Sequence, residues 1–290
     1  MTVSADDVKK LRESTGAGIM DCKNALKETN GDYDQAVDYL RKKGIAKAEK
    51  KASREAKDGS IESYIHPGSK LGVILEINCE TDFVAKTDDF KKFVSSVAVH
   101  IAEKQPKDVA DLNGQPFMNG KSVEEIRKEI VGKLGENITI KRFEIYPYKN
   151  GLIEKYIHPG SKLGVLVEVN TESDAASQSA EFKNFIHDIA MQIAASNPLV
   201  VKRDELSPQV IEREMNIYKT QAQEQKKPEA IAEKIALGKM SKFYEEVCLM
   251  EQSYIKDPNV TIQDLLKQLV AKVGQPVVIR RFVRYQLGQN

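Results

Sequence analysis

"YIHPGSKLG" at residues 64–72 occurs again, without a single change, at residues 156–164. The nonamer lies within a longer repeat, because residues 59–103 return as the similar stretch 151–195, 92 positions later. Self-similarity over a stretch of this length indicates a duplicated structural unit. The fold is therefore expected to contain two copies of one domain.

A second matching pair defines the extent of each copy. Residues 122–146 align with residues 261–285, at an offset that is longer than the first by 47 residues. Because both ends of the second copy match the first, the extra residues must lie between Ala195 and Thr261. The chain thus has one duplicated core with an insertion in its second half.

Each copy shows the same order of predicted elements. Alternating apolar residues on both sides of Pro67-Gly68 predict a hairpin of two strands. Apolar residues at helical spacing predict a helix from Phe90, and the pair Ser122 and Glu125 predicts a second helix with a capping box. A strand rich in β-branched residues closes each copy. The resulting ββααβ pattern belongs to the α+β class, with helices covering a small antiparallel sheet.

The insertion, residues 207–255, has a different pattern. Apolar residues at helical intervals on both sides of Lys227-Pro228 predict two helices joined as an antiparallel hairpin. Two helices cannot complete a bundle, so we expect them to project as a short coiled coil or to find a partner surface. That surface could belong to a second copy of the chain. The alternative is that both helices pack on the duplicated core.

The first 45 residues are unlike the repeats. Short apolar patterns separated by glycine and asparagine predict three helices, of which the third begins after Asp32 and ends at Gly44. Such a module is compact but marginal in stability. Residues 46–58 are rich in Lys and Ala, which predicts a helical or flexible linker. We therefore expect a module that is tethered to the core and not buried against it.

Composition and charge restrict the function classes. The chain has 290 residues, of which 44 are basic and 43 acidic, and a formal net charge of +1. No global positive field would attract nucleic acid or an anionic membrane, so neither is expected as a direct partner. No apolar run approaches the ~18 residues of a membrane span, and the first residues lack the apolar region of a signal peptide. Together with three scattered cysteines, these features favour a cytoplasmic protein.

Motifs for catalysis and for cofactor binding are missing from the sequence. There is no phosphate-binding loop, and Gly16-Ala17-Gly18 lacks the strand and the third glycine of a dinucleotide site. The cysteines and histidines do not stand at the spacing of metal ligands, and His66 and His158 occupy equivalent turns where a structural role suffices. We therefore predict that the protein is not an enzyme and that it needs no cofactor and no metal.

The two copies differ most informatively just after their second strand. The segment Thr81-Asp82-Phe83-Val84 of the first copy corresponds to SDAA in the second, so Phe83 and Val84 align with alanines. The apolar bulk is thus not required by the shared fold. We expect Phe83 to be exposed at the tip between strand and helix, where burial in a partner would contribute ~1.5 to 3 kcal/mol. The alternative is that Phe83 packs inward in the first copy only.

Several separated segments, in the same order along the chain, resemble bacterial translation elongation factor Ts, the guanine-nucleotide exchange factor of elongation factor Tu. "LRESTGAGIMDCKNALKETNGDYDQAVDYLRKKG" is similar to the ubiquitin-associated-like (UBA-like) module of that family, and "EINCETDFVAK" contains its Thr-Asp-Phe-Val segment. "YIHPGSKLGVLVEVN" and "KKPEAIAEKIALGKMSKFYEEV" resemble its second core subdomain and its coiled-coil hairpin. The expected division is a UBA-like module at 1–45, a linker at 46–58, core subdomain N at 59–148, core subdomain C at 149–206 with 256–290, and a coiled-coil hairpin at 207–255.

The resemblance also implies a function in protein biosynthesis. Members of the family bind elongation factor Tu carrying GDP and promote exchange of GDP for GTP. The resemblance places Asp82 and Phe83, within the segment from Thr81 to Val84, between helices of the partner's nucleotide domain, where they disturb its magnesium site. Further contacts implied by the resemblance are Arg12, Ile19 and Met20 on the same domain, and His158, Tyr254 and Ile255 on a distal domain. Ile19 stands where the family often has methionine, so the position stays apolar.

Two other classes of function are open to the residues themselves. A non-catalytic adaptor would use the UBA-like module and the hairpin, but it leaves the difference at Phe83 unexplained. An RNA-binding translation protein would need a basic face with aromatic platforms, which the balanced charge does not indicate. The hairpin allows either a homodimer, and with the partner a 2:2 complex, or a contact with the partner alone.

Overall fold

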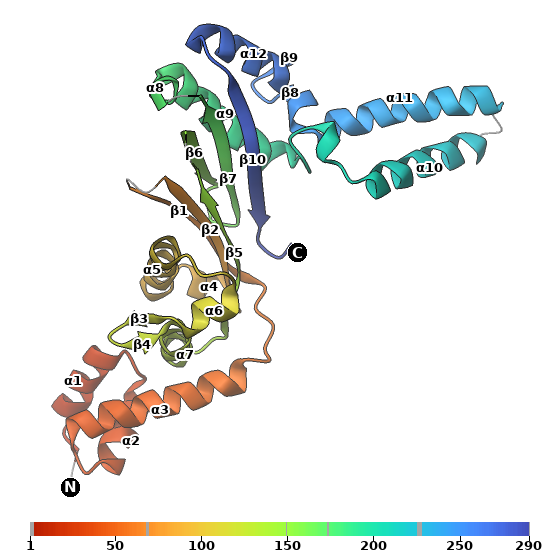
Figure 1. Cartoon of the computed structure of the whole chain (residues 1–290). Helices are drawn as coiled ribbons and strands as arrows, with labels where there is room; N and C mark the ends of the chain where they lie inside the picture. The colour runs from red at the N-terminus through yellow and green to blue at the C-terminus, as the bar shows by residue number, and fades with distance from the viewer. Residues whose placement is uncertain (1–2, 68–69, 149, 173, 225–227, 290) are drawn as a thin grey trace.

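The computed structural model describes residues 3–67, 70–148, 150–172, 174–224 and 228–289. Figure 1 shows an elongated molecule, with a helical module at the N-terminal end, two sheets in the middle and a pair of helices that projects from the far end. Gly68 and Lys227, named above in two predicted turns, lie outside the described residues. The class is α+β, as predicted.

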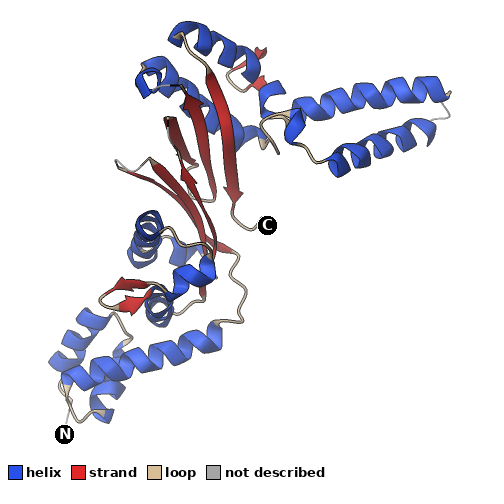
Figure 2. Ribbon diagram, in the orientation of Figure 1, coloured by secondary structure: helices blue, strands red, loops and turns tan. Residues whose placement is uncertain are grey.

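Two antiparallel sheets form the centre of the molecule (Figure 2). Each is a meander in which a hairpin is completed by the last strand of its own copy. The first sheet has the order β1-β2-β5 and consists of β1 (Asp58–His66), β2 (Leu71–Cys79) and β5 (Ile138–Pro147). The second has the order β10-β7-β6 and consists of β6 (Gly151–Ile157), β7 (Leu163–Thr171) and β10 (Val277–Gln286).

Two long helices cover the outer face of each sheet. They are α5 (Asp88–Lys104) and α7 (Val123–Leu134) in the first copy, and α9 (Ala180–Ser196) and α12 (Ile262–Val273) in the second. The capping box predicted at Ser122 is present, as is its counterpart at Thr261 in the second copy, and Gly135 and Gly274 end their helices in the left-handed conformation. Each copy thus has its own core between one sheet and one pair of helices.

Short elements in the connections make each copy more elaborate than the predicted ββααβ. In the first copy they are α4 (Asp82–Ala85), α6 (Val109–Gly114), β3 (Pro116–Met118) and β4 (Lys121–Ser122). In the second they are α8 (Asp174–Ser177), η1 (Arg203–Glu205), η2 (Leu249–Glu251), β8 (Ser253–Tyr254) and β9 (Asp257–Thr261). The hairpin of β3 and β4 turns at Asn119 and Gly120, both at positive φ, which is a turn that an Asn-Gly pair favours.

The inner faces of the two sheets pack on each other through equivalent residues of the repeat. Ile61 and Ile153, Ile74 and Leu166, and Tyr146 and Tyr285 make up the buried cluster between the sheets. Glycines let the strands approach. A Cβ placed at Gly72 would lie 2.8 Å from Cγ2 of Ile153, and one placed at Gly164 would lie 2.6 Å from Cγ2 of Ile61. The last glycine of the repeated nonamer is therefore a packing requirement of the interface between the copies.

Two arginines, each paired with a buried glutamate, link the copies at the same interface. Arg142 donates to Glu76 within the first copy at 2.8 Å, and its guanidinium lies 4.1 Å from the ring centroid of Tyr285 in the second copy. Arg281 repeats this arrangement with Glu168 at 2.6 Å and with the ring of Tyr146 in the first copy at 4.0 Å.

Each arginine of this interface therefore pairs with a carboxylate of its own copy and stacks on a tyrosine of the other. Glu76 is 1% exposed and Glu168 is 4% exposed. A buried carboxylate requires such a partner. Each stacking contact is expected to contribute roughly 0.5 to 2 kcal/mol.

The insertion forms the predicted hairpin of helices. Helices α10 (Pro208–Glu224) and α11 (Glu229–Val247) lie side by side and extend away from both sheets (Figure 1). Small residues line the contact between them, with Ala222, Ala232 and Ala236 buried beside Met240. The alternative in which both helices pack on the core is wrong, because only the base of the hairpin meets the second copy.

The N-terminal module consists of α1 (Ala5–Thr15), α2 (Ile19–Glu28) and α3 (Tyr33–Lys51), around a core that includes Leu11 and Leu26. The expectation that the third helix ends at Gly44 is wrong, because α3 continues to Lys51. Gly44 instead meets Gly132 of α7, where a Cβ on Gly132 would lie 2.8 Å from the Cα of Gly44.

The module is also packed on the core and not merely tethered to it. Helix α3 crosses α7, and Ala48, in the stretch expected to be a linker, is buried within the first core. Glycines at the crossing let the two backbones approach, and the Lys- and Ala-rich sequence after Gly44 has high helix propensity.

Among the residues that the structure describes, no helix combines the length and the apolar character needed to cross a membrane.

We expect Gly164→Val to lower the free energy of unfolding by about 1 to 3 kcal/mol, because the added side chain would overlap Ile61 and Ile157 in the opposing and neighbouring strands. Denaturant unfolding followed by circular dichroism would measure the change. The control is Gly238→Ala in α11, where nothing lies within 4 Å of the new Cβ and a small gain in stability is expected. Equal stability of Gly164→Val and wild type would contradict the packing role.

Candidate functional site

The tip between β2 and α5 is built around a single turn of helix. Thr81 is the N-cap of α4, and its hydroxyl accepts from the backbone N–H of Val84 at 3.4 Å. At the other end, the hydroxyl of Thr87 donates to the carbonyl of Val84 at 2.7 Å. Phe83 is 78% exposed on this turn, so the alternative in which it packs inward is wrong. Val84, by contrast, is 8% exposed and belongs to the first core.

The predicted segment therefore divides into two kinds of residue. Asp82 and Phe83 face outward, whereas Thr81 and Val84 hold the turn on the core. Asp82 pairs with Lys86 at 2.6 Å, one helical turn later. The hydrogen bond from Lys86 lowers the pKa of Asp82, so its carboxylate stays charged at neutral pH. The tip thus presents an aromatic ring beside a negative charge.

The N-terminal module is anchored at the same end of α7 as the tip. The carboxylate of Glu136, just after α7, accepts from the backbone N–H of Thr81 at 3.0 Å and from its hydroxyl at 2.7 Å. Lys133, in the last turn of α7, pairs with Asp89 at 2.8 Å and lies against Gly16 at the end of α1. The structure therefore connects the tip and the N-terminal module to the same end of α7.

The module presents its predicted contact residues to solvent. Ile19 is 54% exposed and Met20 is 64% exposed, both in the first turn of α2, and Arg12 is exposed in the last turn of α1. Two large apolar side chains next to each other on a surface are typical of an interaction site. They cannot belong to the core of the module, which is formed by other residues of the same helices.

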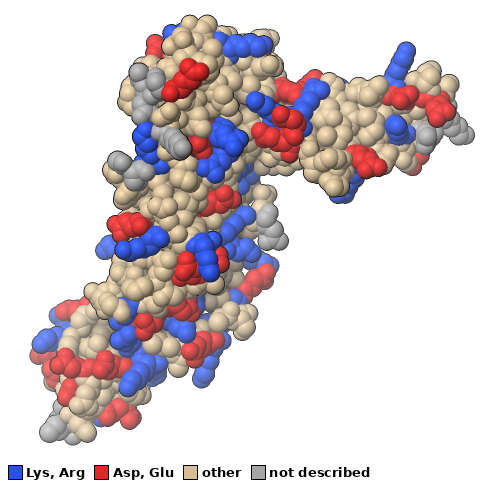
Figure 3. All heavy atoms as spheres, viewed as in Figure 1, with Lys and Arg blue, Asp and Glu red and all other residues tan. Residues whose placement is uncertain are grey.

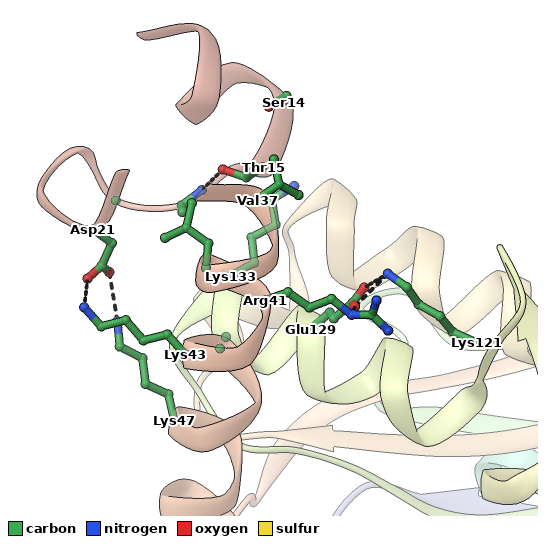
Figure 4. Close-up of a pocket in the computed structure, with 15 residues that line it drawn as sticks. Ser14, Thr15, Asp21, Val37, Arg41, Lys43, Lys47, Lys121, Glu129 and Lys133 are labelled. Carbon is green, nitrogen blue, oxygen red and sulfur yellow. Dashed lines mark hydrogen bonds and ion pairs between the residues drawn. The ribbon is translucent and has the colours of Figure 1, made fainter. Parts of the chain in front are cut away.

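A cleft of about 280 Å³ lies between the module and α7, beside the place where α3 crosses α7 (Figure 4). Ion pairs lie on both of its sides. Asp21 pairs with Lys43 at 3.1 Å and with Lys47 at 2.8 Å, and hydrogen bonds from these lysines lower the pKa of Asp21. Arg41 of α3 and Lys121 both reach Glu129 of α7 at 2.7 Å. The second set joins the module to the core, which helps to fix the orientation of α2.

The three remaining predicted residues gather around the middle of α9. The ring of His158 accepts from or donates to the hydroxyl of Tyr156 at 3.0 Å, and Tyr156 packs edge-on against His187 of α9. The neighbouring residue on α9, Asp188, accepts from the hydroxyl of Tyr254 at 2.5 Å. Segments far apart in sequence are therefore brought to two adjacent residues of α9.

These residues differ in what they can present to a partner. His158 is exposed and Ile255 is 42% exposed, but Tyr254 is only 8% exposed. Burial and the bond to Asp188 raise the pKa of Tyr254, so it stays a neutral donor. The backbone N–H of Ile255 donates to Gln192 at 2.9 Å. Tyr254 thus holds the loop that carries Ile255 and has little surface of its own.

The three cysteines of the chain are poor nucleophiles. Cys22, Cys79 and Cys248 are all buried, and burial raises the pKa of Cys79 to about 12 and that of Cys248 to about 11. Thiols with such pKa values are protonated and unreactive at neutral pH. No group of three or more metal-ligating side chains occurs in the described ranges. The arrangement is suited to binding a macromolecule through two separate surfaces.

Charge on the molecule is mixed and local. Figure 3 shows acidic and basic side chains interspersed over the visible face of the N-terminal module and the first subdomain. The view thus agrees with the net charge of +1. Specific recognition must then come from the exposed apolar residues and from the few charges beside them.

Sequence reasoning missed Glu136 and Lys133, which position the tip and the module. The comparison of the two copies held a signal for Glu136, because the aligned residue of the second copy is Gln275. Nothing in the sequence alone pointed to Lys133, since it is one of many lysines on helical surfaces.

Known proteins of one family are similar to this chain along its whole length. A family model described as Elongation factor TS matches residues 80–289. Proteins named Elongation factor Ts are similar to this chain in Prosthecochloris aestuarii, at 46% identity over 99% of both chains, and in a Nostoc species, at 44% identity over 99% of this chain and 93% of the relative. The protein of that name in Trichlorobacter lovleyi is 42% identical over 100% of this chain and 94% of its own length.

We expect Tyr254→Phe to lower the free energy of unfolding by about 0.5 to 1.5 kcal/mol, because Asp188 would lose a hydrogen-bond donor in a partly buried place. Urea unfolding measures this directly. The control is Tyr156→Phe, which removes a hydroxyl bonded to the exposed His158 and should change stability less. If both variants unfold at the same urea concentration, Tyr254 does not hold its loop in the way described.

Proposed function

The chain belongs to the elongation factor Ts family, and we propose that it binds elongation factor Tu carrying GDP and promotes the release of GDP so that GTP can enter. It is a translation elongation factor and a nucleotide exchange factor, not an enzyme. The relatives cover the helical module, the core and the hairpin together. A separate adaptor function is therefore not needed to explain any of these parts.

Exchange of this kind requires linkage and no active site. A protein that binds the nucleotide-free form of its partner more tightly must weaken nucleotide binding by the same factor that nucleotide weakens its own binding. The exchange factor needs only contacts that differ between the two states of the partner. Two rigidly held surfaces with exposed apolar residues are suited to this task.

The observation that carries the proposal is the exposure of Phe83 on a fixed tip. An aromatic ring that is 78% exposed is unfavourable in the free protein and gains ~1.5 to 3 kcal/mol when a partner buries it. We infer that Phe83 enters the nucleotide domain of elongation factor Tu as a wedge. Asp82, charged at neutral pH, would lie beside it and disturb the binding of the positively charged magnesium ion.

The other exposed residues would supply binding energy that offsets the distortion. Ile19 and Met20, with Arg12 nearby, form one contact region on the N-terminal module, and we propose that it meets the same nucleotide domain. His158 and Ile255 form the other region, and we propose that it meets a distal domain. The role of Tyr254 changes from the one implied by resemblance, since its small exposed area suits support of Ile255 and only a marginal contact.

The domain division also becomes a proposal with one adjusted boundary. We assign the UBA-like module to residues 1–51, because α3 extends to Lys51, and we keep subdomain N at 59–148, subdomain C at 149–206 with 256–290, and the hairpin at 207–255. The paired helices of the hairpin are suited to an antiparallel coiled coil. They could support a homodimer or a 2:2 complex with elongation factor Tu, and the site of action would be the cytoplasm.

We expect Phe83→Ala to reduce the maximal rate of GDP release from elongation factor Tu by about tenfold or more, because only the wild-type ring can act as the wedge. Release of a fluorescent GDP analogue measures the rate at increasing concentrations of exchange factor. The control is Leu199→Ala, which removes another exposed apolar side chain, 58% exposed, outside both contact regions. If Phe83→Ala reached the wild-type rate, the wedge would be disproved although exchange by other contacts would stand.

The double variant Ile19→Ala with Met20→Ala should behave differently. We expect its half-saturating concentration to rise about tenfold or more while the maximal rate of GDP release changes little, since these residues provide binding and do not act on the nucleotide. The same fluorescence titration separates the two parameters. A fall in the maximal rate with unchanged half-saturation would contradict the assignment.

A further inference from the structure

The carboxylate of Glu136, which lies outside the segment from Thr81 to Val84, holds the exposed tip in place. Glu136 accepts two hydrogen bonds from Thr81, from the backbone N–H at 3.0 Å and from the hydroxyl at 2.7 Å. Hydrogen bonds to an ionised acceptor are stronger than neutral ones. Thr81 directly precedes Asp82 and Phe83, so both bonds act at the point where the chain enters α4.

The residues next to Glu136 and Thr81 form a hydrogen bond in the opposite direction. The backbone N–H of Asn137 donates to the carboxylate of Glu80 at 2.7 Å. Asn137 is 2% exposed, and its side-chain amide donates to the carbonyl of Arg54 at 2.8 Å. Two adjacent loops therefore exchange bonds between carboxylates and backbone N–H groups. We call this arrangement, formed by Glu80, Thr81, Glu136 and Asn137, the clasp.

Two residues of the clasp differ in the second copy of the repeat. Glu136 corresponds to Gln275, which carries no charge, and Asn137 corresponds to Pro276, which has no backbone N–H to donate. The carboxylate equivalent to Glu80 is still present as Glu172. The carboxylate of Glu136 and the backbone N–H of Asn137 thus have counterparts of different chemistry in the copy that lacks the exposed phenylalanine.

The tip needs such support because α4 is too short to be stable alone. It has four residues, whereas isolated helices below roughly 12 residues are marginal in water. Within α4, Val84 is buried and Ala85 packs partly against the first core, whereas Phe83 points into solvent. Without an outside anchor the tip would sample many orientations, and a partner would have to order it on binding.

We propose that Glu136 is a positioning residue for nucleotide exchange: it fixes the orientation of Asp82 and Phe83 through Thr81 and thereby preorganises the wedge. The inference rests on the proposed function, which it deepens. Glu136 does not itself have to touch elongation factor Tu. Its effect is exerted through Phe83, so the two residues are expected to be coupled energetically.

The test uses the full chain and the GDP-release titration with elongation factor Tu. Glu136→Ala removes both bonds and should lower the maximal rate of release about tenfold, with less than about a threefold rise in half-saturation. Glu136→Gln keeps one acceptor oxygen and should fall between Glu136→Ala and wild type. Gln275→Ala, the matched variant at the equivalent position of the second copy, should retain the wild-type rate.

A double variant decides whether Glu136 acts through the wedge. If it does, Glu136→Ala combined with Phe83→Ala should be no slower than Phe83→Ala alone. If the fold-reduction in the maximal rate of the double variant equals the product of the reductions in the two single variants, Glu136 acts independently of Phe83 and the inference is overturned. So would a wild-type rate in Glu136→Ala, or an equal loss in Gln275→Ala.

A measurement without elongation factor Tu separates this inference from the proposed function. Amide hydrogen exchange at Thr81 in the free protein should accelerate about tenfold or more in Glu136→Ala and stay unchanged in Gln275→Ala. Unchanged exchange at Thr81 would disprove the clasp whatever the GDP-release assay shows. If instead the wild-type protein failed to accelerate GDP release, the proposed function would fall even with the clasp intact.

Discussion

The contact between the inner faces of the two sheets is the constraint on which the rest of the structure depends. Neither three-stranded sheet has helices on both faces, so each must cover its second apolar face with the other. Gly72 and Gly164 permit the close approach, and two arginines that pair with buried glutamates stack on tyrosines across it. This interface determines the spacing between the tip of the first copy and the α9 surface of the second.

Duplication left one copy free to change while the common fold was retained. Positions in the sheets and the long helices keep their apolar character in both copies, as Phe90 and Phe182 do. The tip does not at Phe83, because this side chain points away from the shared core. The first copy has an exposed aromatic ring with a clasp behind it, and the second copy has the hairpin, inserted between α9 and α12. Binding and positioning are thus distributed over two versions of one domain.

Much of this could be predicted from sequence, for local reasons. Local patterns indicate strands, helix ends and exposure directly. They are the repeated nonamer, the capping boxes at Ser122 and Thr261, and the alanine that aligns with Phe83 in the second copy. Failures occurred where a distant contact decides the outcome. The third helix continues past Gly44, where Gly132 of α7 lies against it. The hydrogen bond from Tyr254 to Asp188 of α9 is another such contact between residues far apart in sequence. Such pairings are set by tertiary packing, which no periodicity encodes.

The stacking across the sheet interface has a further meaning for the history of the fold. Each arginine finds its carboxylate in its own copy and its tyrosine in the other, and both copies contribute in the same way. This reciprocal pattern is the signature of an isologous contact between identical subunits. A single-repeat ancestor would satisfy it by associating with itself about a two-fold axis. Fusion of the two genes would have converted that obligate homodimer into one chain, whose halves could then evolve separately.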